Sequence, residues 1–559
     1  MSSPLFGKVA GARPKHTTFD LSYEKIMNIY GGKLNIVMCD EVVPGDVIKL
    51  GCDAVLRANP MNAPVYSSIN GYVQYFFWPY RFWPEWETFI TRGVSGNEEI
   101  SLPTYEDSWT GTNHGRKKHT IWDQLGFPIS QGEDKLNGFA LPLAFPWYAY
   151  NDIYNEFFRD ENLQEEVSLT NVDLLNVNYS KDYFTSALTS QQRGTAPALP
   201  LVGTAKALFD TPDNFNSDFL NNTSVYGAVK LSNTLNPRFA KVGVRGAEVE
   251  KRYTNCSNIG QNDNYNYAFD REDELSGSTL GSSLGLSANF MDYLNRHNVV
   301  DVSQLITADV SDLRFMFQVQ KWRERSMRGG VRYTEFLQSM YATCPRDDRL
   351  QRPEYIGGCK IPILNTEVIQ TSSTDSTSPQ GHLAGKGIGL GNSRIGNYKV
   401  KEFGLIMGLF YVRPKPMYNQ GINRQWLRKD TFDFFNPLFV GLSEQGIYNA
   451  EIYAQTDQSG LPNPENEQVF GFQGMYDEMR HKMNMAVGDM RDTYDYWHTA
   501  RKFNALPHLN SNFIQCKHSD FSRIFAVPSA EGWIVNFHNQ IKAIRPLPLI
   551  GEPGLIDHF

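Results

Sequence analysis

Residues 71–79 read Gly-Tyr-Val-Gln-Tyr-Phe-Phe-Trp-Pro. The β-branched and aromatic side chains of this stretch favour a pleated strand over a helix, and the final proline ends it. Two further apolar stretches, 34–39 and 47–56, stand upstream and are separated by the turn sequence Val-Pro-Gly-Asp at 43–46. Together these segments predict strands of a β-sheet that are joined by tight turns.

Strand-like segments return near the other end of the chain, at 403–412 and 533–543. Strand-forming segments therefore lie toward both ends of the chain and are separated by long intervening segments. This arrangement suits an antiparallel jelly roll, whose strands pair across large sequence distances. A βαβ succession, which would indicate a doubly wound α/β enzyme, is absent.

A few helices are predicted between these strands. Aromatic residues within 81–90 form a stripe at helical spacing, which core packing explains better than ligand binding. A second helix is expected at 150–162, with Asn151 or Asp152 capping its start. Regular structure is also expected at 315–327 and 333–341.

Composition limits the possible classes of protein. The 559 residues include 13% aromatic residues, 45 Gly and 29 Pro, which favour short strands joined by many turns. The net charge of -8 argues against a basic nucleic-acid-binding protein. None of the six cysteines forms a C-x-x-C pair, the first ten residues lack an apolar signal segment, and the apolar runs are too short to span a membrane. We expect a soluble protein that is made inside a cell.

Four regions are predicted along the chain. Residues 1–30 resemble an extended arm that carries the cations Lys8, Arg13 and Lys15; both a free tail and an arm that contacts a neighbour or nucleic acid remain open. Residues 31–202 are expected to form the first part of the sheet. The Asn-rich segment 203–305 reads as an inserted surface lobe, and 306–559 as the remainder.

Searches for catalytic and metal-binding motifs find only weak matches. The Gly-Ser-Ser-Leu-Gly sequence at 281–285 fits a nucleophile pattern but lies in a Ser/Gly-rich loop. Alternating glycines at 385, 387, 389 and 391 are interpreted as a flexible loop. No histidine or cysteine spacing suits zinc. We predict that the protein is not an enzyme and needs no cofactor.

The segment 321–332 combines five basic residues with a tryptophan. Arginine beside aromatic residues can bind phosphates and stack on bases, but the same residue types are enriched at subunit interfaces, which is the favoured interpretation. The candidate nucleic-acid-binding residues are Lys8, Arg13, Lys15, Arg323, Arg325 and Arg328. The candidate interface residues are Arg332, Tyr333, Arg352, Tyr355, Leu555, Ile556 and Phe559.

Several ordered motifs resemble the major capsid proteins of microviruses, most closely the gokushovirus branch. They stand at 43–46, 150–160, 182–188, 328–335, 350–355, 374–381 and 553–559. The resemblance implies an eight-stranded antiparallel viral jelly-roll barrel with long loop insertions, and copies of the chain that assemble into a T=1 icosahedral shell around circular single-stranded DNA. The 203–305 lobe then becomes a candidate three-fold protrusion, although it carries no match to the family, and the sequence after Leu188 departs from the family pattern.

The same resemblance implies partners and a location. The partners are an internal scaffolding protein, a DNA pilot protein, a small basic DNA-binding protein and a host surface receptor, without membrane insertion. The shell would be assembled in the cytoplasm of a bacterial host and form the virion. A basic partner protein fits the acidic net charge.

Two alternatives from other classes are considered. A carbohydrate-binding jelly roll would use Trp78, Trp83 and Trp86 as a sugar platform, but would call for a secretion signal. A single-stranded-DNA-binding protein would call for a basic chain. The apolar tail 553–559 is expected to dock on a neighbour or on its own barrel.

Overall fold

The stretch 71–79 lies inside strand β5 (Ile69–Pro79), which hydrogen-bonds to a strand on each side. One neighbour is β10 (Glu354–Ile369) and the other is β12 (Gly404–Pro414). Both are antiparallel to β5 and lie more than 270 residues further along the chain. The predicted strand is confirmed, and its partners come from distant parts of the sequence, as a jelly roll requires.

The computed structural model describes residues 16–92, 98–106, 109, 116–129, 141–194, 204–206, 209–210, 230–231, 299–301, 310–329, 333–342, 346–369, 383–456 and 459–549. The chain divides into a larger unit, formed by residues 1–193 and 323–559, and a smaller unit formed by residues 194–322.

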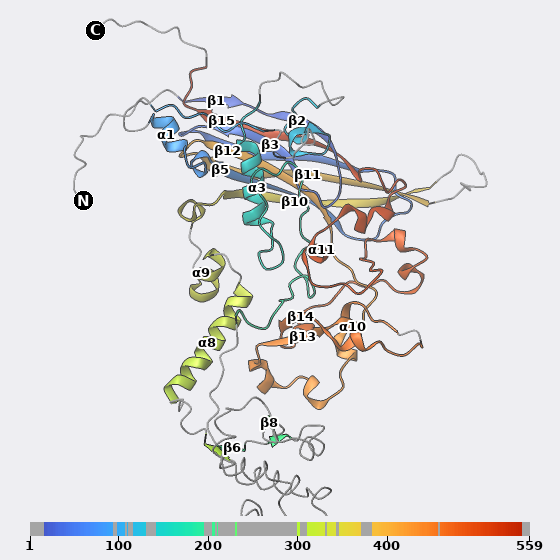
Figure 1. Cartoon of the computed structure of the whole chain (residues 1–559). Helices are drawn as coiled ribbons and strands as arrows, with labels where there is room; N and C mark the ends of the chain where they lie inside the picture. Colours follow the sequence, from blue (N-terminus) through green and yellow to red (C-terminus); the bar gives the residue numbers. More distant parts are fainter. Residues whose placement is uncertain are drawn as a thin grey trace, which may run out of the picture. The chain divides into compact units, whose positions relative to one another are not determined.

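One curled antiparallel sheet dominates the larger unit (Figure 1). Its other strands are β1 (Thr17–Asp20), β2 (Tyr23–Ile29), β3 (Asn35–Val42), β4 (Val47–Ala58), β11 (Leu383–Lys399) and β15 (Trp533–Arg545). The pairs β2·β15, β3·β12, β4·β11 and β5·β10 are nested, so the chain folds as one long hairpin that is then rolled up. This is the jelly-roll order, and the predicted eight-stranded fold is confirmed. Strand β1 adds a short ninth strand beside β15.

The predicted turn at 43–46 joins β3 to β4. Gly45 has φ of +98°, a backbone conformation that glycine adopts without strain. The Asp46 carboxylate is fully buried; it accepts a hydrogen bond from the Val43 amide at 3.2 Å and lies 3.2 Å from the Arg545 guanidinium. The aspartate of the motif therefore ties the turn to the last strand of the barrel.

The glycine-rich stretch interpreted as a flexible loop is strand β11, so that prediction is wrong. Its alternating glycines have period two, which is the period of a strand face. A Cβ on Gly391 would lie 2.6 Å from Ile361, one on Gly387 2.8 Å from Ala58, and one on Gly385 2.2 Å from the Ala63 carbonyl. The glycines thus face neighbours that approach too closely to admit a side chain.

The barrel interior is filled by side chains from facing strands. The rings of Phe410 on β12 and Phe537 on β15 meet at 4.8 Å. The Asn539 side chain crosses the same space, donates to the Val37 carbonyl at 3.0 Å and lies 3.4 Å from the Tyr75 hydroxyl. Strand β12 is buried along almost its whole length, which explains its continuous apolar sequence.

Part of the predicted N-terminal arm belongs to the sheet. Both β1 and β2 pair with β15, and within β2 the side chains of Met27 and Ile29 face the core. The predicted cations Lys8, Arg13 and Lys15 lie outside the described residues.

The predicted helices are present with shifted bounds. The segment 81–90 contains a short 3-10 turn and α1 (Trp86–Thr91), and the second helix is α3 (Phe145–Phe157). Pro146 in its first turn sets the earlier start, because proline is favoured at that position. The predicted cap at Asn151 or Asp152 is therefore wrong: both residues lie in the middle of α3. Helices α8 (Val310–Gly329) and α9 (Tyr333–Tyr341) confirm the remaining two predictions.

Between β12 and β15 the chain forms a second, smaller core. It contains β13 (Glu444–Tyr448), β14 (Val469–Gly474), α10 (Asn449–Ile452) and α11 (Ser511–Ile514). Buried side chains from these elements pack with Tyr183 and Phe184, which lie in the motif at 182–188. That motif is thus a packing and hydrogen-bonding element.

In the smaller unit, β6 (Thr204–Lys206) pairs with β9 (Val299–Asp301), and β7 (Phe209–Asp210) pairs with β8 (Lys230–Leu231). The first pair brings Lys206 opposite Val299. The chain therefore leaves and returns at adjacent positions on either side of residues 207–298.

Candidate functional site

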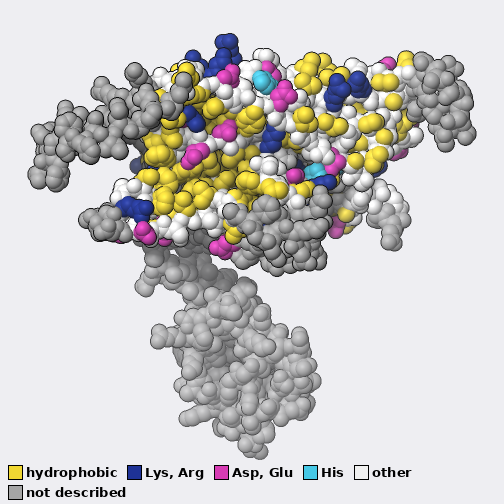
Figure 2. Space-filling model, turned by 90° about the horizontal axis from the view of Figure 1, so that it is seen from above, with side chains coloured by type: hydrophobic (Ala, Val, Ile, Leu, Met, Phe, Trp, Pro, Cys, Tyr) yellow, Lys and Arg dark blue, Asp and Glu magenta, His cyan; other side chains and the backbone are white. Residues whose placement is uncertain are grey.

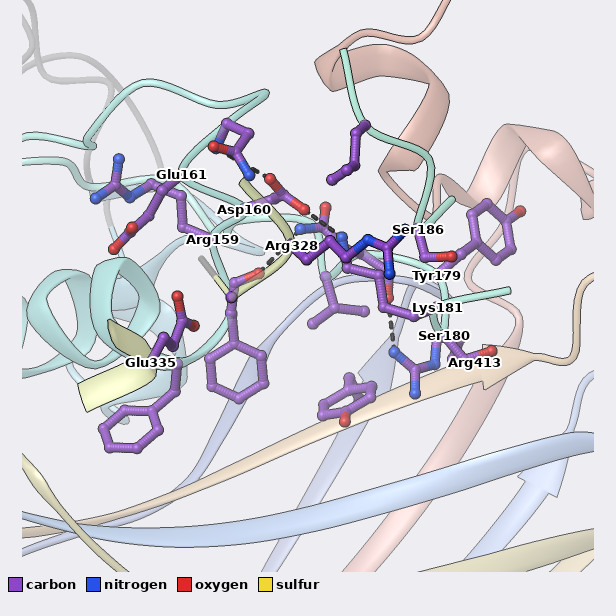
Figure 3. Close-up of a pocket in the computed structure, with 18 of the residues that line it drawn as sticks. Arg159, Asp160, Glu161, Tyr179, Ser180, Lys181, Ser186, Arg328, Glu335 and Arg413 are labelled. Carbon is purple, nitrogen blue, oxygen red and sulfur yellow. Dashed lines mark hydrogen bonds and ion pairs between the residues drawn. The ribbon is translucent and has the colours of Figure 1, made fainter. Parts of the chain in front are cut away.

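The main cavity of the larger unit has a volume of about 650 Å³ (Figure 3). It is lined by residues that follow α3, by the segment 177–188, by the end of α8 and by β12. Charged side chains of both signs converge on it, among them Arg159, Asp160, Lys181, Arg328 and Arg413.

These cations already have partners within the chain. Lys181 forms an ion pair with Asp160, and Arg328 forms one with Glu444 while donating to the Ser443 carbonyl. The Arg413 guanidinium donates to the Asn178 carbonyl at 2.7 Å. The cavity is therefore held together by its own charges, which suits a structural junction.

A smaller cavity of about 300 Å³ shares Ser180 and Arg413 with the first. Its lining holds three cations and no carboxylate: Ser68, Asn70, Tyr72, Ser180, Lys360, Arg413, Pro414 and Lys415. The Arg413 guanidinium carbon lies 5.1 Å from the centre of the Tyr72 ring and 5.5 Å from that of Tyr411, and the two rings stack at 5.2 Å. This chemistry suits a phosphate group or another oxyanion.

Buried ionisable groups elsewhere support the framework. Burial raises the pKa of Asp152 to about 6, although its carboxylate accepts a hydrogen bond from the Trp78 indole at 2.8 Å. Burial also raises the pKa of Glu451, which accepts from the Tyr183 hydroxyl at 2.9 Å and from Arg424 at 3.0 Å. Both carboxylates hold separate elements together.

The cysteines in the described part of the chain are free thiols. Burial raises the pKa of Cys39, Cys52 and Cys516 to about 12, so these thiols stay protonated at neutral pH and are poor nucleophiles. Among the described residues no group of histidine, cysteine and acidic side chains could hold a metal ion. The weak nucleophile motif at 281–285 lies outside the described residues.

The candidate nucleic-acid-binding residues that the structure describes all lie on α8. Arg325 is exposed and Arg323 is half-buried, whereas Arg328 is bound to Glu444 at the main cavity. The structure brings Arg328 close to other cations, and the described residues place neither Arg323 nor Arg325 in the lining of that cavity.

Two of the candidate interface residues, Arg352 and Tyr355, pack on neighbouring rings, because Phe76 and Phe157 meet at 4.8 Å. Arg352 forms an ion pair with Asp347 at 2.6 Å and lies over the Phe157 ring, and Tyr355 at the start of β10 packs on Phe76 with 46% of its surface exposed. Tyr333 begins α9. Arg332, Leu555, Ile556 and Phe559 lie outside the described residues.

Sequence reasoning missed Lys360 and Lys415. They stand in different sequence neighbourhoods and meet only because β10 and β12 both pair with β5. No local sequence motif identifies these two lysines as members of one site. Their proximity follows from the register of the sheet.

The three tryptophans of the alternative sugar platform are buried or half-buried. Trp78 is 2% exposed, and Trp83 and Trp86 pack against the core, with the Trp86 ring 4.8 Å from Tyr80. Within the described residues no helix is long and apolar enough to cross a membrane.

Comparison with known proteins gives the family. Residues 7–555 match the family described as capsid protein (F protein). The chain belongs to this phage capsid family. It is 30% identical to capsid protein VP1 of Chlamydia phage 1 over 98% of its own length and 97% of the relative's, and 29% identical to capsid protein VP1 of Bdellovibrio phage phiMH2K over 99% and 98%. Capsid protein VP1 of Spiroplasma virus 4 is 27% identical over 98% and 97%.

The predicted resemblance to microvirus capsid proteins is confirmed. For a capsid protein the functional sites are the surfaces that contact other copies and the enclosed genome. Figure 2 shows the chain from the side on which β1 and β15 lie in Figure 1, with hydrophobic side chains gathered between scattered charges. On the sheet, Ile26, Leu390 and Ile534 are 72%, 69% and 49% exposed.

Proposed function

We propose that copies of this capsid protein assemble into a T=1 icosahedral shell that encloses circular single-stranded DNA, and that residues 203–305 carry the contact with the host receptor. The role is structural and involves no catalysis. Assembly takes place in the cytoplasm of the bacterial host and yields the virion.

The observation that carries this proposal is the match of a capsid family over nearly the whole chain, joined to a complete jelly roll. A jelly roll tolerates long insertions in its loops because its strands are paired independently of them. Closed symmetry then multiplies weak contacts between copies into a stable shell.

DNA inside the shell requires positive charge. The chain carries a net charge of -8, so we propose that a small basic protein neutralises most of the genome. The carboxylate-free cavity at Lys360, Arg413 and Lys415 is our candidate for a direct phosphate contact, beside the cations Lys8, Arg13, Lys15, Arg323, Arg325 and Arg328. An internal scaffolding protein and a DNA pilot protein complete the proposed partners.

Expression of the full chain with its scaffolding partner tests the proposal. We expect closed particles of T=1 size by cryo-electron microscopy, and single-stranded DNA in particles recovered from infected cells. A chain that stays monomeric under all assembly conditions, or particles of another symmetry, would contradict the proposed shell.

A further inference from the structure

Residues 424–442 expose an unusual density of large apolar side chains. The segment follows β12 and winds through three short 3-10 turns, Arg424–Trp426, Thr431–Asp433 and Pro437–Gly441. Seven of its nineteen residues are large hydrophobics with about half or more of their surface exposed: Trp426, Phe432, Phe434, Phe435, Leu438, Val440 and Leu442.

In this segment large apolar side chains point outward and both arginine side chains point inward, the reverse of an ordinary protein surface. Trp426 and Leu438 are 75% and 84% exposed, whereas the side chains of Arg424 and Arg428 are only 14% and 16% exposed. A segment that merely lined the surface would place its arginines outward and its tryptophan inward.

Polar contacts on the inner side hold the segment in place. Arg424 donates to the Gly446 carbonyl at 2.6 Å and to the buried Glu451 carboxylate at 3.0 Å. The Tyr476 hydroxyl accepts from the Asn436 amide at 3.1 Å and donates to the Phe434 carbonyl at 3.2 Å. The apolar side chains are therefore presented by an ordered backbone, which lowers the entropy cost of docking.

We infer that residues 424–442 form a docking segment that binds a second copy of this chain in the shell. The inference rests on the proposed function, because a capsid protein must contact its own copies. Seven large side chains, each able to bury on the order of 100 Å² or more, provide a substantial part of the ~800 Å² per partner of a stable interface. Exposed apolar surface on this scale is uncommon on proteins that remain monomeric.

Charge argues against nucleic acid as the occupant. Arg424 and Arg428 are engaged with Glu451 and Glu478, and the exposed Lys429 forms an ion pair with Glu467. The outward face therefore offers aromatic and aliphatic groups without free cations to bind phosphates. A second protein surface is the better match.

Cysteine labelling tests the inference on folded material. In the full-length variant Leu438→Cys, we expect a maleimide to react rapidly in unassembled chains and more than about tenfold more slowly in particles, because a docked apolar core excludes water. The parent chain gives the background from its native cysteines. Equal rates in both states would overturn the inference, and so would protection already present in the monomer, which would show that the same chain covers the segment.

A pair of substitutions tests the contribution to assembly. We expect Trp426→Ala with Leu438→Ala to raise the protein concentration needed for assembly by roughly 30-fold or more, as loss of central interface residues does. The matched control is Leu364→Ala with Leu390→Ala, two side chains on the sheet that are each 69% exposed. The control should assemble like the parent.

The outcomes separate this inference from the proposed function. If the parent chain forms no particles, the proposed shell fails. If the parent forms particles and the Trp426/Leu438 pair assembles equally well, or if the control pair is impaired to the same degree, only the docking segment is refuted. Circular dichroism of the unassembled variants confirms that they are folded.

Discussion

Single carboxylates in this capsid protein join elements that lie far apart in the sequence. Asp152 lies in α3 and accepts from the Trp78 indole of β5, and Asp46 ties the first tight turn to Arg545 near the end of the last strand. The residues that flank each aspartate in the sequence give no sign of its bonding partner. Their partners exist only in the rolled-up barrel.

The pKa of Asp152 predicts a pH dependence of stability. Burial raises this pKa from its ordinary value of 3.8 to about 6, so the folded chain holds the proton more tightly than the unfolded chain. The resulting stability is present below pH ~4 and is lost as the pH rises through ~6. We expect Asp152→Asn to be more stable than the parent at pH 7, by up to about 3 kcal/mol, and to show a flatter profile from pH 4 to 7.

Urea unfolding of unassembled chains across that pH range measures the effect. Asp173→Asn, which neutralises an exposed carboxylate near the same helix, serves as the control and should follow the parent. A parent profile parallel to that of Asp152→Asn would contradict the prediction.

Substitution of Gly385 by a larger residue is expected to destabilise the fold by a steric clash. A Cβ at this position would lie 2.2 Å from the Ala63 carbonyl oxygen, and backbone cannot move aside as a flexible side chain can. We expect Gly385→Ala to lower the free energy of unfolding by about 2–3 kcal/mol. Gly441→Ala, where nothing lies within 4 Å of the new Cβ, should remain within ~0.5 kcal/mol of the parent.

At the scale of elements, the sequence predicts strands well where apolar residues dominate and poorly where glycine does. Strands β4, β5, β12 and β15 match the predicted segments because their aromatic and β-branched residues strongly favour the strand conformation. Strand β11 was hidden because its inward positions are glycines, which signal a loop unless their period of two is weighed. Glycine is required at these positions because residues distant in the sequence pack closely against the strand. That packing cannot be read from the sequence.

The candidate phosphate cavity shows the same limit for sites. Lys360, Arg413 and Lys415 come from β10, from β12 and from the residue after β12, and only the pairing of both strands with β5 brings them together. Strand register is set by long-range contacts, so reasoning from local motifs predicted the neighbouring Arg328 and missed these lysines.

The cavity predicts a change in the salt dependence of DNA binding. We expect Lys360→Ala with Lys415→Ala to weaken binding of an oligothymidylate and to reduce the slope of log affinity against log salt by about 0.7 for each phosphate that the variant no longer neutralises. Fluorescence anisotropy over a salt series measures both. The control, Lys49→Ala with Lys542→Ala, removes two exposed lysines that face each other on β4 and β15. An equal weakening in both pairs would show only a general charge effect.

At the scale of the whole molecule, the jelly roll and its insertions are separable in principle. The nested strand pairs form the curled sheet without residues 207–298, and β6 and β9 pair at the base of that segment. Assembly and host contact can then reside in different parts of one chain. This division is what we propose for the 203–305 lobe.

Excision of the lobe tests that division. Lys206 stands opposite Val299, so an Asn-Gly turn in place of residues 207–298 closes a two-residue hairpin in the existing register. We expect the variant to form particles that no longer adsorb to the host bacterium, measured as free particles remaining after incubation with permissive cells. Ile369 stands opposite Leu383 in the same way, so an Asn-Gly turn in place of residues 370–382 gives a matched control that should still adsorb. Normal adsorption by the first variant would place the receptor contact elsewhere on the shell, whereas a failure of both variants to assemble would mean that the insertions take part in building it.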